Sequence, residues 1–288
     1  MSEANILFVN TQLIPFGLML IMLSLGMSLT VQDFKNIALS PKAAFIGLAG
    51  QFFLLPALAF AICLLFQLPP PLATGLMILA ACPGGITSNA LVFAARSDVA
   101  LSVSMTTISS FVTVFTTPLL ASFALWYFYN QGAAPDMSFI KTMKKIFLLT
   151  ILPVVTGMLI KQLAGTLADR LVVWLRPTSM IILILIIIYS TYVSKDRVLS
   201  NIETAGFAIL MMNVLALGLG TFIAIKAQLG PKQITTIGIE IGVQNATMAT
   251  VLILAILEDV SLAIMPTLYG VWMLVSASIY IRLRQKHT

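Results

Sequence analysis

The chain has 288 residues, of which 59% are hydrophobic and only 9% are charged, and its formal net charge is +6. A soluble domain carries about 25% charged residues, so this composition excludes an ordinary soluble protein. The basic residues are spread over loops and the C-terminal tail, which indicates membrane topology rather than nucleic-acid binding. Cys63 and Cys82 lie inside apolar runs and are expected to pack rather than to form a disulfide.

Nine apolar segments follow one another along the chain, and apolar runs of about 18 or more residues are typical of transmembrane helices. Because the connections between them are short, the sequence predicts an all-α polytopic membrane protein with a single transmembrane domain over residues 1–288. The first segment lacks a cleavage pattern after it and is expected to be a retained helix. The nine segments are 11–29, 43–66, 71–94, 100–128, 139–161, 177–194, 204–226, 234–257 and 260–281.

The basic residues of the loops predict an orientation, because cytoplasmic loops carry an excess of Lys and Arg. Nine spans place the termini on opposite sides, and the richer set of loops includes the C-terminus, so the N-terminus is expected outside and the C-terminus in the cytoplasm. The richer set is Lys35, Lys42, Arg96, Lys161, Arg170, Arg176, Lys226, Lys232, Arg282, Arg284 and Lys286, and the poorer set is Lys141, Lys144, Lys145, Lys195 and Arg197.

The second, third and fourth segments carry polar groups. In the third, Cys82–Asn89 is expected to break the helix, because a proline and a glycine pair interrupt it and free carbonyl groups. Such carbonyls at membrane depth are tolerated when they are buried in protein or line a polar cavity. Ser102 and Thr106 of the fourth segment share one helix face, and Gln51 is a lone amide in the second. The alternatives are a packing kink, helix-joining hydroxyls and an interhelical hydrogen bond.

The eighth segment carries Glu240, the acidic residue that the sequence places at membrane depth. A charge near the bilayer centre costs about 2.5–3.5 kcal/mol on insertion scales, so Glu240 requires a partner or a function. Gln244 lies four residues later on the same face, and Gly238 and Gly242 adjoin the pair. Since no Lys or Arg falls in the middle of a segment, the countercharge is expected to be a bound cation or a proton.

A short internal repeat relates the third and eighth segments. A helix with one amide precedes each copy, Gln51 in the first half and Asn213 in the second, and the odd spacing of the segments makes the copies inverted. Inverted repeats with interrupted polar helices indicate a secondary transporter, although chance resemblance between apolar sequences is the alternative. The copies are Ser88–Ala90 with Asp98–Val103, and Gln244–Ala246 with Asp259–Ile264.

Cys82–Asn89 and Glu240–Asn245 together resemble the signatures of the bile acid:sodium symporter family, and Gln51 and Trp272 stand at family-like spacing. The resemblance covers nearly the whole chain. It implies a core domain around two broken, crossing helices, the third and eighth segments, which moves against a panel domain in an alternating-access cycle. The panel would contain segments 11–29, 139–161 and 177–194, and the core 43–66, 71–94, 100–128, 204–226, 234–257 and 260–281.

The resemblance also implies two Na⁺ ions at the crossing and a substrate between panel and core, near Thr87 and Asn245. The first Na⁺ would be bound by Ser88, Asn89, Ser102, Thr106 and Glu240. The second would be bound by the residues Gln51, Glu240 and Gln244. The backbone oxygens of Glu240, Ile241 and Val243 would complete its ligands. The bacterial members imply a location in the bacterial inner membrane.

The chain departs from the family pattern on the substrate side. Where a Thr is expected, it has Ile86 followed by Thr87, and Met273 and Leu274 replace a polar pair after Trp272. The number of segments, nine, resembles that of the animal members of the family, whereas many bacterial members have ten spans. Sodium coupling is therefore more strongly implied than any particular substrate.

The favoured function is Na⁺-coupled symport of an organic anion, either bile-acid-like or a small carboxylate such as pantoate. Two Na⁺ would overcompensate Glu240 and attract an anion. The alternative is proton coupling at Glu240, but the surrounding oxygen-bearing side chains make sense together for a cation. An enzyme is not expected, because the sole histidine is His287 in the tail. The expected partners are the anion and the lipid bilayer, with no nucleic acid and no obligatory protein partner.

Overall fold

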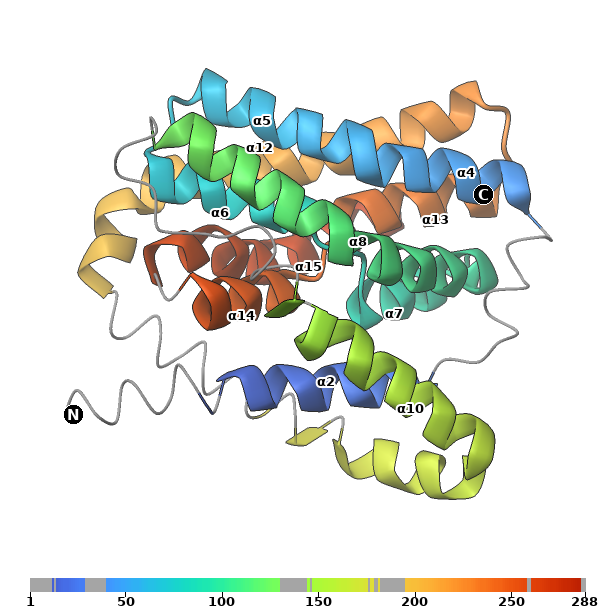
Figure 1. Ribbon diagram of the computed structural model, residues 1–288. Coiled ribbons are helices and arrows are strands. Elements are labelled where there is room, and N and C mark those ends of the chain that lie inside the picture. The colour runs from blue at the N-terminus through green and yellow to red at the C-terminus, as the bar shows by residue number, and fades with distance from the viewer. Residues whose placement is uncertain are drawn as a thin grey trace.

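The computed structural model describes residues 12, 14–28, 40–129, 144–145, 147–175, 177–178, 181, 195–257 and 260–285. Every regular element in these ranges is a helix, which confirms the predicted all-α fold. Figure 1 shows the long helices side by side along roughly one direction. Most of segment 177–194 lies outside the described residues, as do Lys35, Lys141, Arg176, Asp259, Lys286 and His287.

The helices follow the predicted segments, and prolines begin several of them because the first turn has no need of the missing amide. The elements are α2 (Ile14–Ser28), α4 (Pro41–Ala49), η3 (Gly50–Leu54), α5 (Leu55–Leu65), α6 (Pro70–Ala81), α7 (Ile86–Ala94), α8 (Val99–Phe128), η4 (Phe147–Ile151), α10 (Leu152–Leu163), α12 (Lys195–Lys226), α13 (Pro231–Gly242), α14 (Ala246–Ile256), η5 (Val260–Ala263) and α15 (Ile264–Gln285).

Several of these helices are long and apolar enough to cross a bilayer. Four qualify alone, and two bent pairs raise the number among the described residues to as many as six. Several membrane spans are thus supported, and the nine-span topology stays a prediction. The four are Pro41–Leu65, Glu203–Lys226, Pro231–Leu254 and Ser261–Gln285, the pairs are Pro70–Ala81 with Ile86–Ala94 and Val99–Thr113 with Phe115–Phe128, and Pro15–Ser28 and Phe147–Leu163 are shorter apolar helices.

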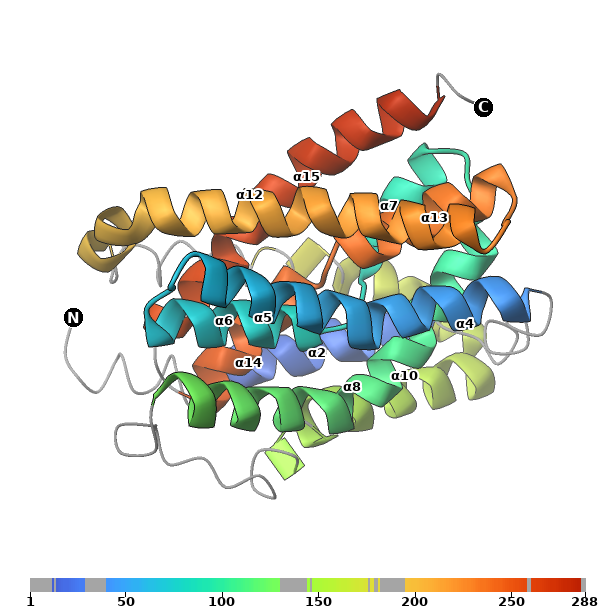
Figure 2. The same ribbon diagram turned by 90° about the horizontal axis from the view of Figure 1, so that it is seen from above.

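The third and eighth segments are both broken, as the sequence predicts. The axes of α6 and α7 differ by 63° across Cys82–Gly85, and α13 ends at Gly242 before α14 begins at Ala246. In Figures 1 and 2, α6 and α14 lie toward the left and α7 and α13 toward the right, so the two broken helices run in opposite directions. The breaks touch, because the Asn245 amide donates a hydrogen bond to the Pro83 carbonyl at 2.9 Å.

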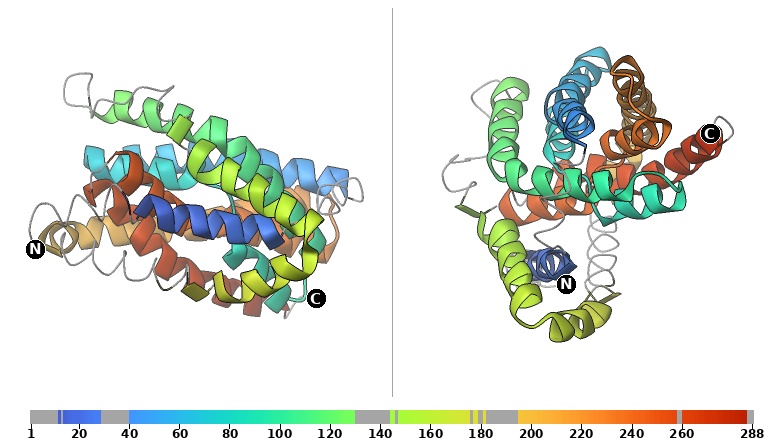
Figure 3. Two further views of the ribbon diagram at one scale, coloured as in Figure 1. Left: turned by 60° about the horizontal axis from the view of Figure 1, so that its bottom comes forward. Right: turned by 90° about the vertical axis from the view of Figure 1, so that its right-hand side faces the viewer.

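A second group of helices lies to one side of this crossing, where α2 packs along α10 (Figure 3). The two backbones approach closely at Gly26 and Gly157. A methyl group on Gly26 would meet the Val154 carbonyl, and one on Gly157 would meet the Leu23 carbonyl. Small residues allow such close packing of helices in membranes. The pair combines the first and fifth predicted segments, two of the three assigned to a panel.

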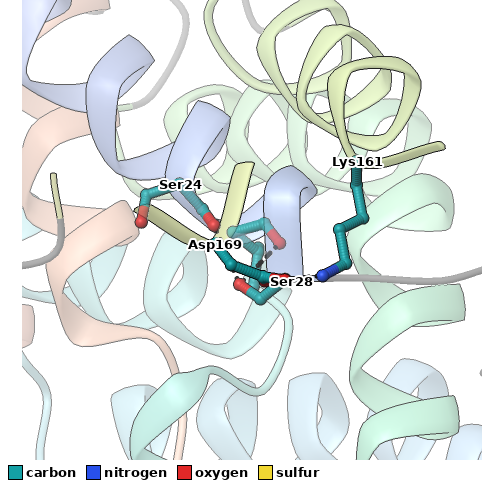
Figure 4. Close-up of polar contacts among 5 residues, drawn as sticks. Ser24, Ser28, Lys161 and Asp169 are labelled. Atoms are coloured by element: carbon teal, nitrogen blue, oxygen red, sulfur yellow. Dashed lines mark hydrogen bonds and ion pairs between the residues drawn. The ribbon is translucent and has the colours of Figure 1, made fainter. Parts of the chain in front are cut away.

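Polar contacts on these two helices are local (Figure 4). The Ser28 hydroxyl bonds back to its own helix at the Ser24 carbonyl, 2.8 Å away. Lys161 reaches from α10 to Asp169, with 2.6 Å between Nζ and Oδ1. Asp169 is 69% exposed, and an exposed ion pair of this kind contributes about 0–1 kcal/mol. Neither contact supplies a partner for the charge on Glu240.

Candidate functional site

Glu240 lies near the C-terminal end of α13 and is completely buried. Its Oε1 accepts a hydrogen bond from the Ser102 hydroxyl at 2.5 Å, and its Oε2 accepts one from the Thr106 hydroxyl at 3.1 Å. Both donors lie on the α8 face that the four-residue spacing predicts. In the described part of the chain, none of its hydrogen-bond partners carries a positive charge. The carboxylate therefore needs a proton or a cation from outside the protein.

The same two hydroxyl groups also contact Asn89 on α7. The Ser102 and Thr106 hydroxyls lie 2.7 and 3.2 Å from Asn89 Oδ1. A hydroxyl group has one proton, whereas a carboxylate oxygen and an amide oxygen are acceptors. Four oxygen–oxygen contacts around Glu240 and Asn89 thus share two protons. Such a cluster has an excess of lone pairs, which suits a hard cation that binds oxygen ligands.

Gly84 allows the backbone to approach this cluster closely. An added Cβ there would lie 2.6 Å from Glu240 Oε2, 3.2 Å from Ser88 Oγ and 3.3 Å from Thr106 Oγ1. Ser88 is buried and bonds locally, since its hydroxyl donates to the Gly85 carbonyl at 2.8 Å. Its side chain also lies within hydrogen-bond reach of the Glu240 carboxylate, and its oxygen faces the Gly84 position. The structure therefore brings together all five residues of the first predicted site.

A second polar cluster adjoins the first through Gln244. Its Nε2 donates to the carbonyl groups of Glu240 and Ile241 at 3.0 and 2.9 Å, and its Oε1 accepts from Gln51 Nε2 at 3.4 Å. Gln51 lies in the π-helical turn η3, a feature frequent at functional sites. Its own Oε1 is buried and has no hydrogen-bond donor among the described residues. A buried acceptor left unpaired costs about 1–3 kcal/mol, and a bound cation would satisfy it.

The α13 break leaves backbone oxygens at this cluster without their helical backbone donors. Val243 leaves the helix in an extended conformation, with φ −121° and ψ 99°. The Asn245 amide, which would continue the helix by bonding to Ile241, donates to Pro83 instead. The Glu240 and Ile241 carbonyl groups thus accept from a side chain, whereas the Gly242 carbonyl is bonded by Asn213 and Tyr269. Of these two, the sequence singled out Asn213 by its place in the repeat and gave no signal for Tyr269.

Thr87 and Asn245 stand at the N-termini of α7 and α14, and both are half-buried. Asn245 Oδ1 caps α14 by accepting from the Met248 amide at 2.9 Å. This use of the oxygen leaves Nδ2 as a donor, beside Gly85. Helix N-termini carry partial positive charge and bind anions. Two such ends meet here, within a few residues of the buried carboxylate.

The family departures occupy different surroundings. Ile86, in the first turn of α7, is 40% exposed and adjoins Thr87. After Trp272, the Met273 side chain is buried in the apolar core, and Leu274 is 45% exposed. An apolar exposed side chain at position 86 gives the neighbourhood of Thr87 a less polar lining than a threonine there would.

Comparison with known proteins finds a matching family and several relatives that are named as sodium-dependent transporters. The sequence model of the family described as sodium bile acid symporter matches residues 15–201. The chain is 30% identical over 254 residues to the probable sodium/metabolite cotransporter BASS2, chloroplastic, of Oryza sativa, covering 87% of this chain and 58% of that protein. It is 30% identical over 266 residues to the uncharacterized sodium-dependent transporter YocS of Bacillus subtilis, covering 90% of this chain and 78% of that protein.

A more distant relative is the human sodium/bile acid cotransporter 4, at 26% identity over 269 residues. That match covers 92% of this chain and 61% of the human protein. The chain thus spans less than two-thirds of the length of the rice and human relatives.

Proposed function

Because the chain belongs to the sodium bile acid symporter family, we propose that it is a secondary transporter that couples the movement of a small organic anion to Na⁺. The chain is a multi-pass membrane protein. The observation that carries the proposal is the oxygen cluster at Glu240, in which four contacts share two protons and the partners are uncharged. A Na⁺ ion would neutralise the carboxylate and use the spare lone pairs.

The first Na⁺ would lie beside Gly84, where the surrounding oxygens converge. Proton coupling at Glu240, the alternative, is less well supported. A proton on Glu240 would add one donor, but the four contacts among Glu240, Asn89, Ser102 and Thr106 would then still share three protons. The site therefore fits a cation better than a proton. Its proposed ligands are Ser88, Asn89, Ser102, Thr106 and Glu240.

The second Na⁺ would lie between Gln51 and the α13 break. The unpaired Oε1 of Gln51 would supply one ligand. A 180° rotation of the Gln244 carboxamide would replace its nitrogen by its oxygen beside the Glu240 and Ile241 carbonyls, so that all three oxygens could bind the ion. Unwound carbonyl groups of broken helices serve as ion ligands in secondary transporters. The proposed ligands are Gln51, Gln244 and Glu240 with backbone oxygens of Glu240, Ile241 and Val243.

The substrate would bind at Thr87 and Asn245, where two helix N-termini and the Asn245 Nδ2 donor attract a carboxylate. Two Na⁺ with one Glu240 carboxylate leave a local charge of about +1, which couples anion binding to sodium occupancy. Symport of two Na⁺ with a monovalent anion moves one net charge, worth about 2.3 kcal/mol per 100 mV. We propose a bile-acid-like anion or a small carboxylate such as pantoate.

Transport would proceed by alternating access between two groups of helices. The panel would contain α2 and α10 with segment 177–194, and the core would contain the remaining helices around the crossing. The contact of α2 with α14 supports a panel that lies against the second broken helix. We propose a bacterial inner-membrane location with the N-terminus outside and the C-terminus in the cytoplasm, and no obligatory protein partner.

Gln51→Ala is expected to weaken Na⁺ binding about tenfold, because one amide ligand is worth about 1.5 kcal/mol to a charged group. The measurement is a NaCl titration of the melting temperature of purified protein, with choline chloride keeping the ionic strength constant. Gln162→Ala, at an exposed position on α10, should titrate like the unmodified protein. An unchanged midpoint in Gln51→Ala would remove this residue from the site.

A further inference from the structure

The carbonyl of Gly242, the last residue of α13, is secured by two other helices. In a continuous helix it would accept from the Ala246 amide, but that amide donates to the Gln244 carbonyl at 2.8 Å. The replacement donors are Asn213 Nδ2 on α12 and the Tyr269 hydroxyl on α15, each at 2.6 Å. Both lone pairs of the Gly242 oxygen are therefore used.

These donors form a closed and fully buried network. Asn213 Nδ2 also donates to the Tyr269 oxygen at 3.0 Å, so the two amide protons and the hydroxyl proton all have acceptors. The Ser276 hydroxyl donates to Asn213 Oδ1, and the Gly242 carbonyl, which can only accept, requires that Nδ2 face it. Asn213 and Tyr269 are both 0% exposed. A satisfied polar network in a low-dielectric interior rigidifies the groups that it joins.

Glycine makes this contact between α12 and α13 possible. A methyl group on Gly242 would lie 2.5 Å from Leu217 Cγ, and one on Gly220 would lie 3.1 Å from the Ile237 carbonyl. The helices therefore approach more closely than larger residues would permit. This approach brings the short Asn213 side chain within hydrogen-bond distance of the α13 backbone.

We propose that Asn213, Tyr269 and Ser276 are positioning residues for the second Na⁺ site, an inference that rests on the proposed function. The proposed ligands include the Glu240, Ile241 and Val243 carbonyls and skip Gly242. The network explains the omission, since the Gly242 oxygen is occupied by α12 and α15. The network also holds the peptide group that joins Gly242 to Val243, and so orients the Val243 backbone.

The first broken helix has a simpler version of the same arrangement. The carbonyl of Ala81, the last residue of α6, accepts from the Thr117 hydroxyl on α8 at 3.0 Å. In the predicted repeat, α8 and α15 are equivalent, because each follows a broken helix. At both breaks, therefore, a hydroxyl from the next span secures the terminal carbonyl. The second break has Asn213 and Ser276 in addition. It is also the break whose backbone oxygens are proposed as Na⁺ ligands, whereas the first site is proposed to use side chains.

Tyr269→Phe keeps the ring and removes one of the two bonds to Gly242. The midpoint of the NaCl thermal-shift titration should rise about threefold to tenfold, the effect of one buried hydrogen bond. Tyr280→Phe is the matched control, because the Tyr280 hydroxyl also joins α15 to α12, through Thr221 at 2.6 Å, and bonds to no proposed ligand. Its midpoint should equal that of the unmodified protein.

Melting temperatures in choline chloride separate positioning from simple stabilisation. A purely structural role would lower this baseline and leave the NaCl midpoint unchanged, which would overturn the proposal, as would an equal shift in Tyr280→Phe. If Tyr269→Phe does not fold, Ser276→Ala removes the hydroxyl that bonds to Asn213, together with its local contacts to the Trp272 and Met273 carbonyls, and should raise the midpoint by a smaller factor. If Na⁺ does not stabilise the unmodified protein, the proposed function is wrong. If Na⁺ stabilises the unmodified protein and the NaCl midpoint of Tyr269→Phe is unchanged, only the positioning role is wrong.

Discussion

Glu240→Gln is expected to abolish Na⁺-dependent transport and Na⁺-dependent thermal stabilisation together. The substitution preserves shape and one oxygen but removes the one negative charge in both proposed ligand sets. Removing one partner of a buried charge pair costs about 3–5 kcal/mol, so Na⁺ affinity should fall by more than about 100-fold. The NaCl thermal-shift titration and uptake of labelled taurocholate or pantoate into proteoliposomes measure the two effects.

The control is Glu203→Gln, which makes the same chemical change at an exposed position on α12. It should titrate and transport as the unmodified protein does. Retention of sodium dependence in Glu240→Gln would show that the buried carboxylate does not bind the ion. One of the Ser102 and Thr106 hydroxyls can still donate to the amide oxygen of the new side chain, and the other can accept from its amide nitrogen, so a folded variant is expected.

Asn245→Asp is expected to separate the two ligands, with anion uptake lost and Na⁺ stabilisation retained. Aspartate caps a helix as well as asparagine does, so the bond from the Met248 amide should survive. The Nδ2 donor is replaced by a negative oxygen, which repels a carboxylate. A hydrogen bond to a charged group is worth about 1.5–3 kcal/mol, and the repulsion adds to its loss, so uptake should fall by more than about 100-fold.

Asn245→Ser tests whether the cap or the donor matters. Serine keeps a capping oxygen without adding charge, so uptake should fall less than in Asn245→Asp while the helix remains capped. Anion uptake by Asn245→Asp at the normal rate would place the substrate elsewhere. Loss of Na⁺ stabilisation in the same variant would instead indicate that the residue supports the ion sites.

The breaks in the third and eighth segments were predictable for different reasons. Pro83 cannot donate a helical hydrogen bond, so the first break was visible locally, whereas the second was implied by the glycines of the repeat and by the family resemblance. The shared face of Ser102 and Thr106 followed from helix periodicity, and the structure confirms it with bonds from both hydroxyls to one carboxylate. The first break and the shared face needed only neighbours within a few residues.

Contacts between distant segments could not be predicted in the same way. Gln51 alone read as an interhelical hydrogen bonder, and its place beside Gln244 depends on how two helices 193 residues apart pack. Tyr269 sits in an ordinary apolar helix, and its bond to the Gly242 carbonyl has no counterpart in local sequence. Pro83 and Asn245 were each notable, but the hydrogen bond between their backbones is a product of the crossing.

The most direct test of the account is equilibrium binding of radioactive Na⁺ to the purified protein. Saturable binding is expected that excess choline does not displace, with a cooperative curve for two ions and no saturable binding to Glu240→Gln. Absence of saturable Na⁺ binding to the unmodified protein, or equal binding to Glu240→Gln, would contradict a sodium site at the buried carboxylate.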